Sequence, residues 1–363
     1  MKRLPALAFM AMLSAGCASN TAGVGYYWQS VSGHLKLMQA ARPVDDWLAD
    51  EAAPSRLKER LEKARRIRQF AVSELALPDN ASYHRYADLQ RRAAVYNVVA
   101  APALSLTLET WCFPVAGCVG YRGYFLESDA RSFADSLDEA LEVAVYPVQA
   151  YSTLGWMNWA GGDPLLSTFI TYPEGELARI IFHELSHQVV YVQNDTAFNE
   201  SFATTVERLG GARWLNRSTD QARADYATFD NRRRAFRALT RSTRERLKAI
   251  YEDAHLLDDT KLQRKAVAMA DFRQQYERLK AGWNGYAGYD PFVAAANNAT
   301  FAAQAAYDDW VPAFEALFER EGRDFTRFYD AVRALAHRPK EERQAALREL
   351  APAAFAANHH DCP

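Results

Sequence analysis

The chain has 363 residues, of which 49% are hydrophobic and 24% are charged. This composition excludes a disordered or fibrous protein, and the length allows a sizeable buried core. The formal net charge is only −2, so no excess of basic residues indicates a nucleic-acid partner.

The first 17 residues are typical of an export signal. Lys2 and Arg3 supply a positive start, residues 4–13 are mostly apolar, and the segment ends in a run of small residues before Cys17. This ending resembles the bacterial lipobox, so we expect residues 1–17 to be a lipoprotein signal peptide and Cys17 to carry the lipid. A plain secretory signal is the alternative.

The expected location follows from the same segment. Ala18 stands where aspartate would retain a lipoprotein at the inner membrane in the enterobacterial sorting pattern, which favours the outer membrane. No later segment is apolar for long enough to span a bilayer. We therefore expect residues 18–363 to form one domain at the bacterial cell envelope, held to the membrane by lipid at Cys17 and facing the periplasm.

The elements that follow are mainly helical. Residues 26–77 have helical periodicity with a break at Pro43, and residues 212–363 are almost wholly helical in period. Residues 93–110 and 119–126 carry the alternating, β-branched pattern of neighbouring strands. Residues 142–154 also have strand character, and their Pro147 restricts them to a sheet edge or a bulge. The pattern predicts a mainly α protein with a small mixed β-sheet, in the α+β class.

Two cysteines lie near the predicted strands. Cys112 and Cys118 are six residues apart, and an exported protein meets an oxidising compartment. We therefore expect them to form a disulfide. Metal binding by the pair is the less favoured alternative, because no histidine or further cysteine stands near it.

A predicted helix that begins after Pro173 carries the motif His-Glu-Leu-Ser-His. His183 and His187 are four residues apart, so both imidazoles project from one helix face and can bind a single metal ion. Glu184 points elsewhere, which suits a carboxylate that takes a proton from metal-activated water. An ordinary helix with two unrelated histidines is the alternative.

A second helix is predicted from about Ala197 to Leu209, ending at Gly210 and Gly211. Its Glu200 can fold back under the first helix and complete a His, His, Glu set, since catalytic zinc normally has three protein ligands. Glu207 lies two turns further along the same face, where it can accept a hydrogen bond from a ligand imidazole.

These two helices resemble those of the gluzincin metallopeptidases, in particular the zinc aminopeptidases. Asn199, Glu200, Glu207 and Arg208 match the Asn-Glu pair of that family and the second Glu seven residues on. The whole chain is also similar to a family of bacterial lipoproteins described as predicted aminopeptidases. The resemblance implies a zincin-like core with one Zn²⁺ ion, ligands His183, His187 and Glu200, and supporting roles for Glu207 and Asn199.

The chain departs from the gluzincin pattern in two respects. Only twelve residues separate His187 from Glu200, fewer than is typical of gluzincins. No motif of the Gly-x-Met-Glu-Asn kind, which helps aminopeptidases to hold the substrate amine, is present. Peptide hydrolysis is therefore better supported than aminopeptidase specificity.

The resemblance also suggests residues around the substrate. Gluzincins often use a Tyr or His across the cleft to stabilise the oxyanion, and Tyr307 and Tyr289 are the candidates here, with ordinary aromatic packing as the alternative. Zincins place an edge strand above the metal, to which an extended substrate adds by main-chain hydrogen bonds. Residues 142–154 are the candidate for that strand.

The function expected from the sequence is zinc-dependent hydrolysis of peptide bonds, with Glu184 as the general base and a peptide as the substrate. An aminopeptidase of the periplasm is the first candidate. The alternatives are a zinc endopeptidase that cleaves envelope proteins or cell-wall peptides, and a non-catalytic envelope scaffold with a vestigial site. The sequence predicts no oligomeric state.

Overall fold

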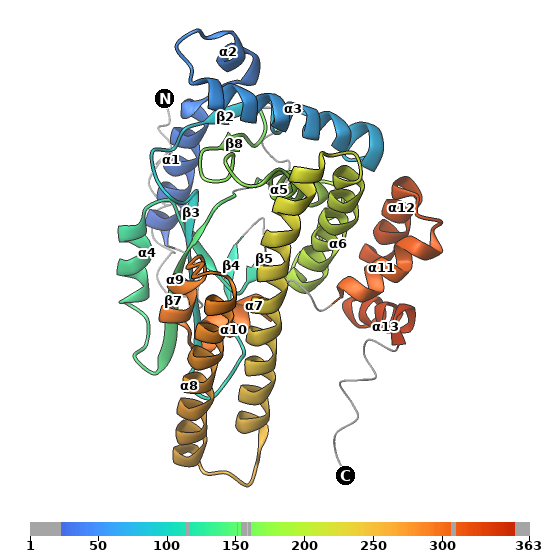
Figure 1. Ribbon diagram of the computed structural model, residues 1–363. Coiled ribbons are helices and arrows are strands. Elements are labelled where there is room, and N and C mark those ends of the chain that lie inside the picture. The colour runs from blue at the N-terminus through green and yellow to red at the C-terminus, as the bar shows by residue number, and fades with distance from the viewer. Residues whose placement is uncertain are drawn as a thin grey trace, which may run out of the picture.

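The structure is a computed structural model that describes residues 23–113, 117–150, 152–153, 158, 161–305 and 310–352 (Figure 1). Cys17 and Tyr307 lie outside these residues. The helices are α1 (Val24–Ala40), α2 (Val44–Ala49), α3 (Ser55–Leu75), α4 (Glu127–Ala134), α5 (Glu174–Ser186), α6 (Thr196–Leu215), α7 (Asp220–Glu252), α8 (Asp258–Gly282), α9 (Asp290–Ala295), α10 (Asn298–Ala305), α11 (Val311–Arg320), α12 (Phe325–Ala336) and α13 (Lys340–Leu350). The strands are β1 (Ala41–Pro43), β2 (Arg85–Ala87), β3 (Val95–Pro102), β4 (Trp111–Phe113), β5 (Gly117–Val119), β6 (Arg122–Tyr124), β7 (Leu141–Val148) and β8 (Leu165–Leu166).

The prediction of a mainly α protein with little sheet is confirmed, but the described strands form three small sheets in place of one. The orders are β1-β2-β8, β6-β3-β7 and β4-β5. Only β3 and β7 are long, and they pair antiparallel over their full length. The other strands have two or three residues each, too few to extend a common ladder.

The strand predictions fit the sheet β6-β3-β7. β3 pairs with β6, so the two segments expected to be neighbours are neighbours. β7 contains Pro147 and stands at the edge of this sheet, with β3 as its partner among the described strands. An edge tolerates proline because one side of the strand has no ladder to complete.

Helix α5 lies within the main apolar core, packed against α3, α6 and α7. Its Leu177, Ile181 and Leu185 are fully buried, as expected from their helical spacing. The same core includes Leu37 of α1 and Leu347 of α13, so it joins the two ends of the described chain. The His-Glu-Leu-Ser-His motif is therefore carried by a helix with little freedom to move.

Helix α6 corrects one prediction, because it continues through Gly210 and Gly211 to Leu215. The glycines mark close packing and not a helix end. A Cβ atom on Gly210 would lie 2.6 Å from Leu75 Cδ1 and 3.0 Å from Phe182 Cδ2. Glycine here lets α6 approach α3 and α5, and that approach outweighs its low helix propensity.

The long helices α7 and α8 form a hairpin with its own apolar core, which includes Phe236, Phe272 and Tyr276. Figure 1 shows this hairpin, in yellow and orange, extending away from α3 and α5. No helix in the described part of the chain is both long enough and apolar enough to cross a membrane.

The expected disulfide is present between Cys112 and Cys118, which face each other across the β4–β5 hairpin. The hairpin also contacts the segment between α5 and α6. The backbone N–H of Cys118 donates to Asn194 Oδ1 at 2.7 Å. Gly117 lies against the same side chain, where a Cβ atom would come within 2.4 Å of Asn194 Oδ1. The disulfide hairpin thus packs on the connection between α5 and α6.

Candidate metal centre

The two motif histidines meet at one end of α5. His183 lies in the last turn, and His187 follows as the C-cap with helical backbone angles. Their Nε2 atoms lie 3.2 Å apart. This is the geometry that i, i+4 spacing on a helix produces, and it brings two nitrogen donors to one point.

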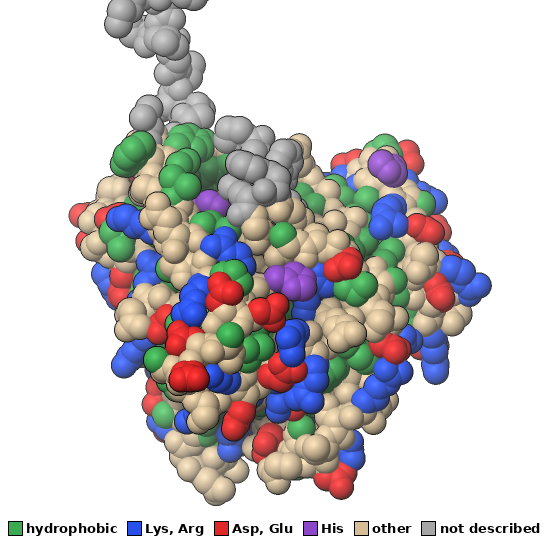
Figure 2. Space-filling model, turned by 90° about the horizontal axis from the view of Figure 1, so that it is seen from above, with side chains coloured by type: hydrophobic (Ala, Val, Ile, Leu, Met, Phe, Trp, Pro, Cys, Tyr) green, Lys and Arg blue, Asp and Glu red, His purple; other side chains and the backbone are tan. Residues whose placement is uncertain are grey.

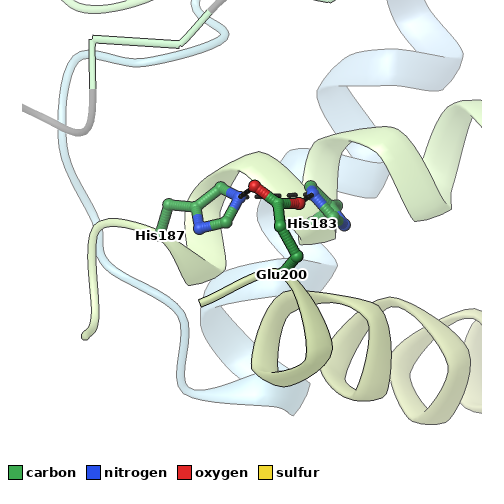
Figure 3. Close-up of side chains that lie close together, drawn as sticks. All are labelled: His183, His187 and Glu200. Atoms are coloured by element: carbon green, nitrogen blue, oxygen red, sulfur yellow. Dashed lines mark hydrogen bonds and ion pairs between the residues drawn. The ribbon is translucent and has the colours of Figure 1, made fainter. Parts of the chain in front are cut away.

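Glu200 on α6 reaches the same point (Figure 3). Its Oε2 lies 3.3 Å from His183 Nε2, and its Oε1 lies 3.8 Å from His187 Nε2. Ligand atoms of the three residues all lie within 4.8 Å of one another. The short connection from His187 therefore does not prevent Glu200 from joining the histidines.

Asn199 makes the short connection possible. Its side-chain amide accepts from the N–H of Val192 and donates to the C=O of Val192, both at 2.8 Å. Asn194 turns the chain in the left-handed conformation, at φ 62°. These contacts fold residues 188–195 back onto the first turn of α6, which places Glu200 under α5.

Asp195 fixes the start of α6 in two ways. Its carboxylate accepts from the N–H of Phe198, the usual N-cap contact. It also forms a buried salt bridge at 2.6 Å with Arg343 of α13. The position of Glu200 therefore depends on a helix near the C-terminal end of the described chain.

Glu207 orients the His183 ring by contacting Nδ1, whereas His187 and Glu200 lie near Nε2. Its Oε2 lies 3.1 Å from His183 Nδ1, so Nδ1 can donate and leave the Nε2 lone pair for a metal ion. The other oxygen of Glu207 accepts from the buried guanidinium of Arg179. Arg179 also contacts Glu176 at 3.0 Å and the Tyr226 hydroxyl at 3.1 Å. The His183 ring is thus held by a chain of contacts across α5, α6 and α7.

The donor set fits a zinc ion. In a tetrahedron with metal–ligand distances of about 2.0–2.1 Å, neighbouring ligand atoms lie about 3.3 Å apart. The two Nε2 atoms lie 3.2 Å apart and Glu200 Oε2 lies 3.3 Å from His183 Nε2, both close to that value, while the other oxygen of Glu200 is the one that lies 3.8 Å from His187 Nε2. Two imidazoles and a carboxylate are ligands that zinc prefers, and three protein ligands is the number typical of catalytic sites, whereas structural sites usually have four.

The charges at the site favour a cation. Burial alone would lower the pKa of His183, but the hydrogen bonds to Glu200 and Glu207 outweigh it and raise that pKa well above its usual value. Burial would raise the pKa of Glu207, yet Arg179 and His183 hold it down at about 2. Burial lowers the pKa of His187 to about 4. Glu200 and Glu207 therefore favour a positive charge at the His183 ring, and a metal ion bound at Nε2 would supply that charge in place of a proton.

Glu184 stands beside this group without belonging to it. Burial raises the pKa of its carboxyl to about 7; His183 opposes the rise, while Glu200 and Asp163 add to it. A carboxylate with a pKa near neutrality can accept a proton and return it at physiological pH. Glu184 thus has the properties of a general base next to the ligands.

Three tyrosines that the sequence analysis did not select lie close enough to Glu200 to be affected by its charge. Burial is the main cause that raises the pKa of Tyr121, Tyr146 and Tyr191, and the Glu200 carboxylate adds to the rise in each. Tyr121 keeps 39% of its surface exposed. Tyr191 follows His187 by four residues, but α5 ends at Ser186, so helical spacing does not place Tyr191 beside the histidines.

The two predicted oxyanion-stabilising residues, Tyr289 and Tyr307, are not among these three tyrosines near Glu200. Tyr289 stacks on Phe236, with ring centroids 4.1 Å apart, and also contacts Trp283 and Tyr286 in the core of the α7–α8 hairpin. These contacts give Tyr289 a packing role. Tyr307 lies outside the described residues, so its role stays a prediction.

The edge strand β7 lies near the same group. Tyr146 is the partner of Asn97 in the β3–β7 register and makes a side-chain hydrogen bond to it. Further along β7, the C=O of Val143 accepts from Asn297. The part of β7 at Val143 is therefore covered by the turn before α10. Tyr146, three residues further on, is close enough to Glu200 for the carboxylate to raise the pKa of its hydroxyl.

Comparison with curated proteins and with solved structures found no significant match. The family described as "Putative aminopeptidase" matches residues 25–347. The matched region contains the three residues whose ligand atoms converge, together with Glu184 and Glu207. The description names an activity but no metal. Because the match covers most of the chain, this protein belongs to the "Putative aminopeptidase" family.

Proposed function

We propose that this protein is a zinc-dependent peptidase of the gluzincin type, and that it acts as an aminopeptidase on peptides in the periplasm. The observation that carries the proposal is the convergence of His183, His187 and Glu200, with Glu184 beside them. Family membership supports peptide hydrolysis, and the donor distances support zinc.

The chemistry divides between the metal and the protein. A zinc ion supplies Lewis acidity, which polarises a peptide carbonyl and makes water a better nucleophile. His183, His187 and Glu200 would hold the ion, and Glu207 would fix the tautomer of His183. Glu184 accepts the proton that the attacking water loses and returns it to the leaving amine.

The surroundings of the ligands suggest how a peptide is held. An extended substrate can add to the edge of β7 by main-chain hydrogen bonds. The hydroxyls of Tyr121, Tyr146 and Tyr191 are donors near Glu200, and one of them aimed at the scissile carbonyl would stabilise its developing negative charge.

The test compares peptides that have a free N-terminus with the same peptides after acetylation. We expect the purified, zinc-loaded protein to release residues one at a time from free N-termini and to leave acetylated peptides intact. A chelator should abolish this activity, and added zinc should restore it. Internal cleavage of the acetylated peptides would instead identify an endopeptidase for envelope proteins or cell-wall peptides. A protein with one bound zinc and no cleavage would be a non-catalytic scaffold.

We also propose that lipid at Cys17 holds the protein to the outer membrane, facing the periplasm, because the ending of the leader resembles the lipobox. Replacement of Cys17 by Ser should abolish incorporation of a radioactive fatty acid and release the protein from membranes. Equal labelling of the variant and the unchanged protein would contradict the assignment.

A further inference from the structure

The first described helix, α1, carries three large apolar side chains in contact with solvent. Trp28 is 73% exposed, Val31 is 55% exposed and Leu35 is 52% exposed. Their spacing of three and four residues puts them on one side of the helix. Figure 2, which views the molecule from above, shows hydrophobic side chains gathered on the surface on the side where α1 lies in Figure 1. We call these three residues the apolar face of α1.

The opposite side of α1 is the one that packs on the protein. Leu37 is buried in the main core, and His34 is buried beside it. A Cβ atom on Gly33 would lie 2.3 Å from the ring of Phe125, so the helix is in tight contact there. The apolar face is therefore not a loosely packed side of a mobile helix but an outward surface of a docked one. Exposed apolar patches of this kind commonly mark a surface that meets a membrane or a partner.

The position of α1 in the chain favours a membrane. Val24, its first residue, is the seventh residue after Cys17. An extended chain spans at most about 3.6 Å per residue, so the start of α1 stays within roughly 25 Å of a lipid carried by Cys17. A lipid on Cys17 would therefore keep the apolar face close enough to the bilayer surface to contact it.

Few charged residues of the described chain lie near the apolar face, and they form no basic patch, so the face suits an apolar contact. Helix α1 contains Lys36 and no acidic residue, so nothing on it repels a membrane. Leu126, which is 54% exposed, is followed by Glu127 and Asp129 in the first turn of α4, so this turn does not add positive charge. Tryptophan prefers the interface between lipid and water, and an amphipathic helix binds there through its apolar side.

We propose that the apolar face of α1 docks on the surface of the lipid bilayer. The proposal uses the lipid anchor at Cys17 for its location, but the contact itself comes from Trp28, Val31 and Leu35. The face would hold the protein in a fixed orientation on the membrane, where lipid at Cys17 alone would leave it free to rotate.

The first experiment uses the lipidated protein in vesicles that contain brominated phosphatidylcholine, which quenches nearby tryptophan. We expect quenching of part of the emission, and we expect Trp28→Phe to abolish it although Trp28 is one of eight tryptophans. Trp283→Phe, in the α7–α8 hairpin core, is the control and should leave the quenching unchanged. Quenching that survives in Trp28→Phe would overturn the proposal.

The second experiment separates the docking face from the anchor. A chain that begins at Ala18 has no lipid but keeps every described residue, and we expect it to float with vesicles of phosphatidylcholine alone, with little dependence on salt. Replacing Trp28, Val31 and Leu35 by Ser should reduce the bound fraction at least about tenfold, since each large apolar side chain taken from water contributes more than a factor of ten.

The matched control carries Leu257→Ser, Leu262→Ser and Val267→Ser, which replace side chains that are 79%, 43% and 55% exposed at the α7–α8 hairpin. It should float like the unchanged chain. Equal loss in both triple variants, or no flotation of the unchanged chain, would overturn the proposal. So would a change of mass in sedimentation from dimer to monomer without a change in flotation, because the apolar face would then bind a second copy. Absence of fatty-acid label on Cys17 would refute the anchor without affecting the flotation results, because the chains that begin at Ala18 carry no lipid.

Discussion

At the scale of single residues, the proposed mechanism separates three metal ligands from one general base, and substitutions can test that separation. His183, His187 and Glu200 supply the converging donor atoms, so replacing any of them by Ala should remove bound zinc. Glu184→Gln keeps all three ligands and the shape of the side chain. It should retain about one equivalent of zinc while turnover falls by roughly 10² or more, the order expected for loss of a general base.

Metal content by atomic emission and peptide hydrolysis, measured on the same samples, decide this prediction. Full activity of Glu184→Gln would exclude Glu184 as the base. Full zinc content of Glu200→Ala would exclude Glu200 as the third ligand.

The candidate ligands could be found from the sequence because their geometry is local. Two histidines four residues apart on a helix project from the same face wherever the helix lies. Asn199 and Glu200 follow after one short connection. Tyr121 and Tyr146 could not be found in this way, because strand pairing and a disulfide hairpin bring them towards Glu200. Arg179 was missed for the same reason, since its contact with Glu207 depends on how α5 packs against α6.

At the scale of elements, the glycines of α6 allow a close approach of helices. Gly210→Ala would place a methyl group against Leu75 and Phe182, which are both fully buried. Overpacking usually costs 1–3 kcal/mol, and the better helix propensity of alanine returns up to about 1 kcal/mol. We expect the free energy of unfolding to fall by about 1 kcal/mol, measured by urea denaturation.

The matched control is Gly282→Ala at the end of α8, where a Cβ atom would meet nothing within 4 Å. It should be neutral or slightly stabilising. If Gly210→Ala were as stable as Gly282→Ala, close packing would not explain why α6 contains glycine.

The disulfide hairpin is the second element with a testable role. Replacing Cys112 and Cys118 by Ser should lower the free energy of unfolding by roughly 2 kcal/mol, a modest value because the closed loop is short. Activity per folded molecule should fall less than stability, since the described part of the hairpin hydrogen-bonds Asn194 and none of His183, His187 and Glu200. Thermal unfolding and hydrolysis of the same samples provide the comparison. A variant with unchanged stability but little activity would place the hairpin in the substrate site.

At the scale of the whole molecule, the sequence predicted the class of fold better than its arrangement. Helical periodicity predicted the long helices because each buries one face. The sheets β1-β2-β8 and β4-β5 were not predicted, since strands of two or three residues carry too little pattern to show their partners. The end of α6 was misplaced because glycine marks both helix ends and close helix packing, and only the neighbours in space distinguish them.

One long-range contact links the C-terminal helices to the metal centre. Arg343 of α13 and Asp195 at the start of α6 form a salt bridge in which both side chains are almost fully buried, at 4% and 3% exposure. Removing one partner of a buried pair leaves the other charge unpaired and typically costs 3–5 kcal/mol. Arg343→Met should therefore lower the free energy of unfolding by about 3 kcal/mol, and zinc affinity should fall too, since Asp195 caps the helix that carries Glu200.

Two further variants make this prediction specific. Lys340→Met removes an exposed positive charge from the same helix and should change neither stability nor zinc affinity measurably. Asp195→Asn keeps a side-chain oxygen for the N-cap but removes the charge, so Arg343→Met should cost less in that background than alone. Urea denaturation and zinc titration of the unchanged protein, the two single variants Arg343→Met and Asp195→Asn, and the double variant measure the coupling between Arg343 and Asp195. Equal cost of Arg343→Met in both backgrounds would show that α13 supports the metal centre only by packing, without the buried ion pair.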